Sequence, residues 1–169
     1  MTVIAWVVEG TWAACVDAVR AHAAEDDEVV LLHVNDPDIP GLAHAAFTAL
    51  LGRGGRPHHD PGPRVEDIMA TSGAELLDHA AQRLGRPCTK LALSGRVERE
   101  VVAAAADADL LVVARDGDRA HLGPRSLGPA TRFVVDHAPC PVLLVWPEHA
   151  PGVHTMPPPP PHDHHRRHP

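Results

Sequence analysis

The chain has 169 residues, 44% of them hydrophobic, and its 22 acidic and 15 basic residues give a formal net charge of −7. This length favours one domain with one core, and the acidic balance argues against nucleic acid as a main partner. The sequence opens without a basic and apolar leader and has no apolar run near the roughly 20 residues of a membrane span, so we expect a cytoplasmic protein without a membrane segment.

Short apolar runs alternate with helical patterns along the chain. Strands are predicted at residues 3–8, 29–34, 90–93, 110–114 and 142–146, and helices at residues 11–24, 65–84, 98–106 and 131–138. Most of these strands are nearly continuous in apolar residues, which is typical of parallel strands covered on both faces. Strands that alternate with helices require right-handed crossovers. The sequence therefore predicts an α/β protein with a three-layer, doubly wound, five-stranded parallel sheet.

Two segments fall outside this alternation. Residues 52–63 are rich in Gly, Pro and Arg, which predicts a mobile surface loop, and residues 150–169 are rich in Pro and His with little to bury. We expect one domain over residues 1–148 and a disordered tail over residues 149–169. The histidines of the tail are chelating side chains, but a tail without fixed geometry does not favour a metal site.

Several side chains have predicted places in or near the core. The helix at residues 65–84 spaces a set of apolar residues along one face, namely Ile68, Met69, Leu76, Leu77, Ala80 and Leu84. Cys15, Cys88 and Cys140 are odd in number and widely spaced, which indicates reduced thiols packed in the core. His33 ends a strand, and such a residue is more often a half-buried histidine with satisfied hydrogen bonds than a metal ligand.

The segment from Ala114 to Arg132 follows an apolar strand, contains three glycines and leads into a helix. A turn of this kind is a typical phosphate site, because free backbone N–H groups and the helix dipole both face the anion. Pro129 stands at the helix start, where its fixed φ is suitable but its missing N–H is not. No P-loop lysine follows these glycines, and no dinucleotide fingerprint follows the first strand.

Four blocks of sequence together resemble the universal stress protein family. They are Val-Val-Glu-Gly-Thr at residues 7–11, Leu-Leu-His-Val at 31–34, Ala-Asp-Leu-Leu-Val-Val-Ala-Arg-Asp-Gly at 108–117 and His-Ala-Pro-Cys-Pro-Val-Leu-Leu-Val at 137–145. The last block is the most specific, and the four span the whole predicted domain. The resemblance implies an adenine nucleotide alpha hydrolase-like fold with strand order 3-2-1-4-5. It also implies ATP or another adenine nucleotide as ligand, and a homodimer formed through the last strand, Val142 to Trp146.

The chain follows the nucleotide motif of that family only in part. Nucleotide-binding members carry a glycine, two residues, a second glycine, nine residues, a third glycine and then Ser or Thr. Here Ala114 stands at the first glycine, Gly117 matches the second, Gly128 matches the third after ten intervening residues, and Pro129 replaces the hydroxyl residue. Pro129 removes a hydroxyl and a backbone N–H that would face phosphate.

Two further positions carry over from the family. Glu9 replaces the Asp that usually ends the first strand, so that the charge is kept on a longer side chain. Val34 matches an apolar position that lies against the adenine in binders.

Four arginines in the loop offer a replacement for the lost donors: Arg115, Arg119, Arg125 and Arg132. Ser126 and Thr131 add hydroxyl groups. In the alternative interpretation, Asp116 and Asp118 pair with some of these arginines on a solvated surface. The predicted binding residues are Glu9, Val34, Ala114, Arg115, Gly117, Arg125, Ser126, Gly128 and Thr131, without catalytic or metal-binding residues.

These observations predict a non-catalytic protein of stress adaptation that acts as a dimeric interaction or regulatory module, with nucleotide binding weak or lost. The alternative is an ATP-binding member of the family that uses a rearranged, arginine-containing phosphate loop. ATP hydrolysis ranks last, because neither a general base nor a metal-binding carboxylate stands out in the sequence.

Overall fold

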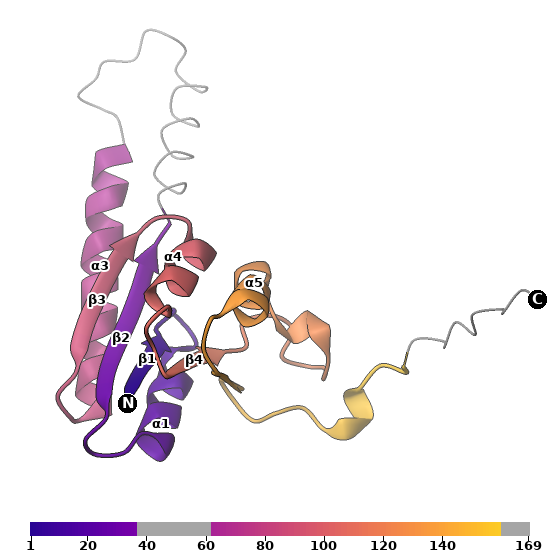
Figure 1. Cartoon of the computed structure of the whole chain (residues 1–169). Helices are drawn as coiled ribbons and strands as arrows, with labels where there is room; N and C mark the ends of the chain where they lie inside the picture. Colours follow the sequence, from indigo (N-terminus) through magenta and orange to yellow (C-terminus); the bar gives the residue numbers. More distant parts are fainter. Residues whose placement is uncertain (37–61, 160–169) are drawn as a thin grey trace, which may run out of the picture.

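The computed structural model of the chain describes residues 1–36 and 62–159. Its strands are β1 (Thr2–Trp6), β2 (Glu28–Asn35), β3 (Thr89–Ser94), β4 (Leu110–Ala114) and β5 (Val142–Val145). They form one sheet in the order β3-β2-β1-β4-β5, and every neighbouring pair is parallel. The predicted fold class and strand order are confirmed (Figure 1).

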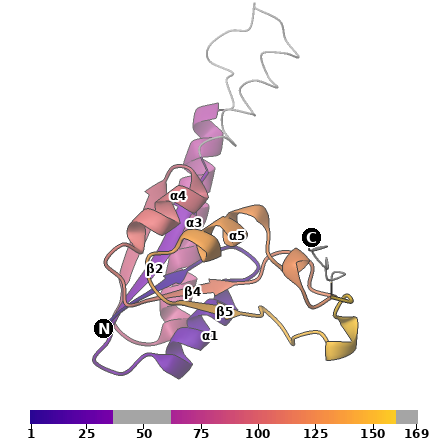
Figure 2. The ribbon, with the colours of Figure 1, turned by 45° about the vertical axis from the view of Figure 1, so that its right-hand side comes forward.

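Helices cover both faces of this sheet, as Figures 1 and 2 show. They are α1 (Trp12–His22), α3 (Gly62–Leu84), α4 (Val97–Ala104) and α5 (Pro129–His137). Because side chains alternate along a strand, β1 contributes to both sides: Val3 and Ala5 lie in the apolar cluster with α1 and α3, and Ile4 and Trp6 lie in the cluster with α4 and α5. The core is thus two apolar layers separated by the sheet.

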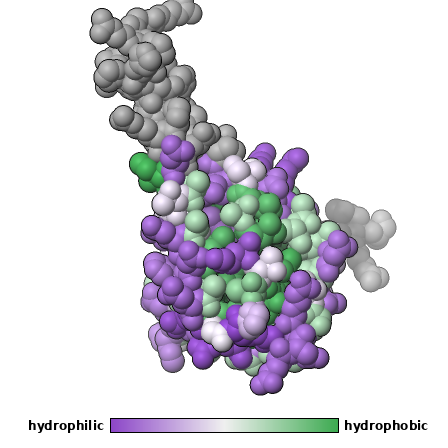
Figure 3. Space-filling model, turned by 90° about the vertical axis from the view of Figure 1, so that its left-hand side faces the viewer, coloured by the Kyte–Doolittle hydropathy of each residue, from purple (hydrophilic) through white to green (hydrophobic). Residues whose placement is uncertain are grey.

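Figure 3 shows the face that lies at the left in Figure 1, where apolar side chains gather within a polar surround. The sheet has β3 as an edge strand. Its Leu91 and Leu93 are only partly buried against the cluster with α4 and α5. The short helix α4 therefore covers this edge of the sheet incompletely.

The long helix α3 differs from its prediction at its first turns. It begins at Gly62, so residues 62 and 63 belong to a helix and not to the predicted loop, whose residues 52–61 lie outside the described part of the chain. Leu77, Ala80 and Leu84 are buried as predicted, but Ile68 is 66% exposed. The start of α3 extends past the ends of the strands (Figure 1), so no sheet is available there to cover an apolar face.

All three cysteines are free thiols, as predicted, but only Cys15 is fully buried. Burial raises the pKa of the Cys15 thiol to about 12. Cys88 and Cys140 are half-buried, and desolvation raises the pKa of each. The raised pKa values leave the thiols protonated and unreactive near neutral pH.

The structure describes the segment after β5 as far as residue 159. Val153–Thr155 form a single 3₁₀ turn. Residues 160–169 lie outside the described part of the chain. Among the described helices, none is both long and apolar enough to cross a lipid bilayer.

Candidate functional site

The carboxyl ends of parallel strands lie at one edge of the sheet, and ligands bind there where the strand order reverses. That reversal falls between β1 and β4 in this sheet. Two structures flank it: a pocket at the ends of β1 and β2, and the loop of residues 115–128 between β4 and α5, here called the phosphate loop.

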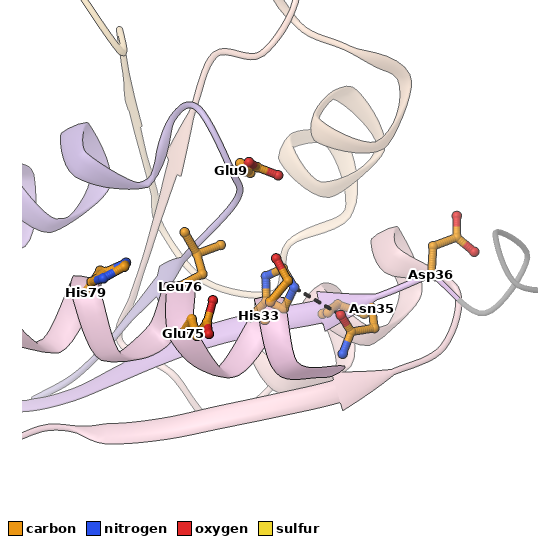
Figure 4. Close-up of a pocket in the computed structure, with 10 residues that line it drawn as sticks. Glu9, His33, Asn35, Asp36, Glu75, Leu76 and His79 are labelled. Atoms are coloured by element: carbon orange, nitrogen blue, oxygen red, sulfur yellow. Dashed lines mark hydrogen bonds between the residues drawn. The ribbon is translucent and has the colours of Figure 1, made fainter. Parts of the chain in front are cut away.

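The pocket has a volume of about 420 Å³ and is lined by Glu9, residues 33–36 and the face of α3 between Ser72 and His79. Glu9 lies in the turn from β1 to α1, where Gly10 has a φ of +78° and the Val8 carbonyl accepts hydrogen bonds from the N–H groups of Thr11 and Trp12. This turn leaves Glu9 exposed, across the pocket from the residues of α3 (Figure 4).

His33 is held by hydrogen bonds at both ring nitrogens. Its Nδ1 lies 2.9 Å from the Val7 carbonyl, which can only accept, so Nδ1 carries a proton. Its Nε2 lies 3.2 Å from Asn35 Oδ1, and with the proton on Nδ1 this contact is a hydrogen bond when the Asn35 amide is turned so that its NH₂ group donates to Nε2. His33 is half-buried, and the interpretation of a satisfied histidine is confirmed.

Gly73 brings α3 close to this histidine. A Cβ at Gly73 would lie 2.7 Å from His33 Cδ2, nearer than real Cβ atoms approach. Sequence reasoning missed both Gly73 and Asn35 as parts of the site. The alternation of β2 places Asn35 on the same side of the sheet as His33, which was the one available signal.

The pocket lining combines carboxyl groups with apolar side chains. Glu9, Asp36 and Glu75 bring carboxyl groups to its lining, which includes neither Lys nor Arg among the residues that the structure describes. Leu76 and Val34 add apolar side chains to the lining, but Val34 is only 6% exposed and packs into the cluster with α4 and α5, on the other face of the sheet from Leu76. The structure thus brings together Glu9 and Val34, two of the predicted residues, in surroundings that repel an anion.

The phosphate loop folds back on itself through backbone hydrogen bonds. The N–H of Gly117 donates to the Ser126 carbonyl at 3.0 Å, and the N–H of Asp118 donates to the Arg125 carbonyl at 2.8 Å. A Cβ at Gly117 would collide with the Arg125 carbonyl oxygen and lie 2.9 Å from the carbonyl carbon of Ser126. Close backbone approach therefore requires glycine at this position.

The start of α5 is capped by a carboxylate of the loop itself. Gly128 is the N-cap residue of α5, and its N–H donates to Asp116 Oδ1 at 2.7 Å. Pro129 follows at the first helical position and has no N–H to offer. Asp116 therefore supplies the negative charge that the helix dipole favours, at the place where a phosphate would bind.

The predicted pairing of Asp116 and Asp118 with arginines is wrong. Asp116 accepts from Gly128 instead. Asp118 accepts from the N–H of Ala120 at 2.8 Å and from His121 Nδ1 at 2.9 Å, and these two bonds hold the pKa of Asp118 below its usual range. Asp118 is thus satisfied by donors two and three residues away, whereas the folding of the loop brings the Gly128 N–H to Asp116.

Three of the four arginines in or next to the loop have partners within the protein. Arg115 donates to Ser126 Oγ and lies over the Trp146 ring at 4.8 Å, while its Nε is buried without a hydrogen-bond partner. Arg119 lies 3.0 Å from Glu148. Arg132 donates to the Pro124 carbonyl. Arg125 is exposed, and its side chain makes no hydrogen bond within the described residues. Three of the four thus brace the loop and do not converge on an open site.

The remaining predicted residues are Ala114 before the loop, Ser126 within it and Thr131 in the first turn of α5. Ala114 ends β4, and non-glycine residues in the described ranges all have negative φ, so its backbone does not require glycine. Ser126 and Thr131 are 1% and 2% exposed. Ser126 Oγ donates to the Gly123 carbonyl at 2.7 Å. Both residues are thus buried, and the Ser126 hydroxyl makes its hydrogen bonds within the loop.

Comparisons with known proteins agree with this architecture. The sequence pattern of the universal stress protein family matches residues 8–145. The hypothetical protein MJ0577, whose structure served to assign its biochemical function, is 18% identical with a TM-score of 0.64, and the match covers 88% of this chain and 97% of that one. A search of curated proteins finds no match.

Two further solved structures share the fold. A universal stress protein in complex with cAMP is 18% identical with a TM-score of 0.54, over 88% of this chain and 98% of that one. The universal stress protein UspA from Lactobacillus plantarum is 20% identical with a TM-score of 0.57, over 86% of this chain and 97% of that one.

Proposed function

Because the chain belongs to the universal stress protein family, we propose that it is a non-catalytic, dimeric interaction or regulatory module of stress adaptation in which nucleotide binding is weak or lost. The observation that carries this proposal is the hydrogen bond from the Gly128 N–H to Asp116. The phosphate position at the start of α5 already has an anionic occupant in the chain itself.

A phosphate group that enters this site has to displace the Asp116 carboxylate. The displacement costs a charge-assisted hydrogen bond, about 1.5–3 kcal/mol, and leaves two anions near each other. The carboxyl groups of Glu9 and Glu75 in the adjacent pocket add to the repulsion of a triphosphate. These features support a role that does not depend on tight nucleotide binding.

The alternative function is ATP binding through a rearranged, arginine-containing loop. It is favoured by the exposed side chain of Arg125, and by the buried Arg115 Nε that lacks a partner. A family relative of the same fold has been solved with cAMP. The two functions make opposite predictions for Arg125.

We expect calorimetry with ATP to give a Kd weaker than about 100 μM, a binding free energy near about −5.5 kcal/mol. The Arg125→Ala variant should bind ATP as weakly as the parent, because Arg125 has no ligand to contact in the capped loop. ATP binding near about 1 μM that is lost in Arg125→Ala would establish the alternative function. Mass spectrometry of small molecules retained through purification provides an independent check.

We expect the homodimer to form along β5, which is an edge strand. The carbonyls of Pro141 and Val145 accept hydrogen bonds from β4, so the backbone groups of Val142 and Leu144 point away from the sheet. Leu144→Pro removes an outward N–H and should shift sedimentation from dimer to monomer at micromolar concentration. Leu144→Ala loses packing but keeps that N–H, and should stay dimeric. A monomeric parent contradicts this prediction.

A further inference from the structure

The segment that follows β5 runs alongside the phosphate loop. Three contacts join residues 146–157, here called the strap, to the loop in the same order along both segments. Arg115 lies over the Trp146 ring, Arg119 Nη1 lies 3.0 Å from Glu148 Oε1, and the Leu122 N–H donates to Thr155 Oγ1 at 3.1 Å. Contacts in a consistent register indicate a docked segment and not a chance crossing.

Thr155 is oriented for its contact with the loop. Its Oγ1 donates to the Gly152 carbonyl at 2.7 Å, which directs a lone pair toward the N–H of Leu122. The Thr155 N–H also donates to Gly152, at 2.9 Å, and closes the 3₁₀ turn. Next to Leu122, a Cβ at Gly123 would lie 3.5 Å from Cδ of Pro157, so Gly123 faces the Pro157 ring.

The residues held by the strap connect directly to the cap of α5. The Gly123 carbonyl, one residue beyond Leu122, accepts from both the N–H and the Oγ of Ser126, at 3.1 and 2.7 Å. The Ser126 carbonyl in turn accepts from the N–H of Gly117. Gly117 follows Asp116, the residue that caps Gly128. The strap and the cap therefore lie at two sides of one hydrogen-bonded turn.

The strap is also held weakly enough to be released. Beyond the half-buried Trp146, the large apolar side chains of the strap, Val153 and Met156, are 75% and 57% exposed, so docking of this part buries little apolar surface. The pair of Arg119 and Glu148 is exposed and adds at most about 1 kcal/mol. Segments with few buried contacts open at low free energy.

From these contacts we infer that the strap regulates the phosphate loop. While docked, it holds the loop in the arrangement in which Asp116 caps Gly128, and its release loosens the loop and admits an anion. This inference rests on the proposed function, because it takes the capped loop as the resting state. It adds that the C-terminal segment sets the affinity of the loop for phosphate-bearing ligands.

The test compares amide hydrogen exchange in the full chain and in the double variant Glu148→Ala, Thr155→Val. Exchange should be at least tenfold faster at Leu122, Ser126 and Gly117, and unchanged in β1, which shows that the variant is folded. The control is Thr71→Val, since the Thr71 hydroxyl donates only to the Asp67 carbonyl within α3. Unchanged loop exchange, or faster exchange at Leu122 alone, overturns the inference.

A second measurement tests the effect on ligand binding. The same double variant and the parent are titrated with ATP, and both are also titrated in the Asp116→Ala background. Strap release should strengthen ATP binding at least threefold over the parent and add nothing after Asp116→Ala, because the cap is then already absent. Equal affinities of the double variant and the parent, or the same gain in both backgrounds, overturn the regulatory role. Tight ATP binding by the parent would refute the proposed function, and the exchange experiment would still decide whether the strap holds the loop.

Discussion

The variant that combines Asp116→Ala with Pro129→Ser is expected to bind ATP about a hundredfold more tightly than the parent, a gain of about 2.8 kcal/mol. Asp116→Ala removes the carboxylate that occupies the start of α5 and frees the Gly128 N–H. Pro129→Ser restores a backbone N–H and a hydroxyl at the first helical position. Each change should contribute at least about tenfold, because each supplies a donor that phosphate can use.

Calorimetry on the two single variants and the double variant measures these contributions. Asp116→Asn keeps an acceptor for Gly128 without its charge, so it separates electrostatic repulsion from occupation of the site. Asp107→Ala removes the same charge from the turn before the amino end of β4, away from the loop, and should leave ATP affinity unchanged. If the double variant binds no better than the parent, the lost donors are not the reason for weak binding.

Gly117→Ala is expected to destabilise the protein by about 1–3 kcal/mol, the usual cost of overpacking. The added Cβ would collide with the backbone of Arg125 and Ser126, which cannot move without breaking the hydrogen bond from Gly117 to Ser126. The midpoint of urea unfolding should fall without a change in slope, since the surface exposed on unfolding stays nearly the same.

Gly95→Ala is the matched control for this experiment. The three atoms nearest to a Cβ at Gly95 would all belong to the Glu100 side chain, with Oε1 at 2.6 Å and Cγ at 2.8 Å, and this side chain can rotate away where backbone cannot. Its stability should stay within about 0.5 kcal/mol of the parent. Equal unfolding midpoints for Gly117→Ala and the parent would show that residues 117–118 separate readily from residues 125–126. That result would contradict the hydrogen bonds that join these two parts of the loop.

The pocket and the loop together suggest how the family scaffold has diverged in this chain. The acidic pocket includes the apolar residues Val34 and Leu76 in its lining, whereas the start of α5 beside it is occupied by the Asp116 carboxylate. Such a site repels the phosphate groups of a nucleotide more than its base and ribose. The proposed role as an interaction module therefore agrees with both halves of the site.

The sequence by itself determined the fold. Apolar runs at residues 3–8, 29–34 and 110–114, separated by helical patterns, are sufficient for a parallel sheet, because both periodicities are local properties and right-handed crossovers restrict the topology. The sequence also identified three departures of this loop from the nucleotide motif of the family: Ala114, the extra residue before Gly128, and Pro129. Fixed φ and missing side chains or N–H groups are properties of single residues.

Only the tertiary structure decided which groups meet. Asp116 and Gly128 are 12 positions apart, and nothing in their spacing favours a bond between them over a pair of Asp116 with any of four arginines. The exposed Ile68 and the docked Thr155 were likewise outside the reach of periodicity and composition. The reason is physical: local sequence fixes the conformation of each segment, but hydrogen bonds across a loop depend on how packing closes it and on which donor and acceptor it brings within reach.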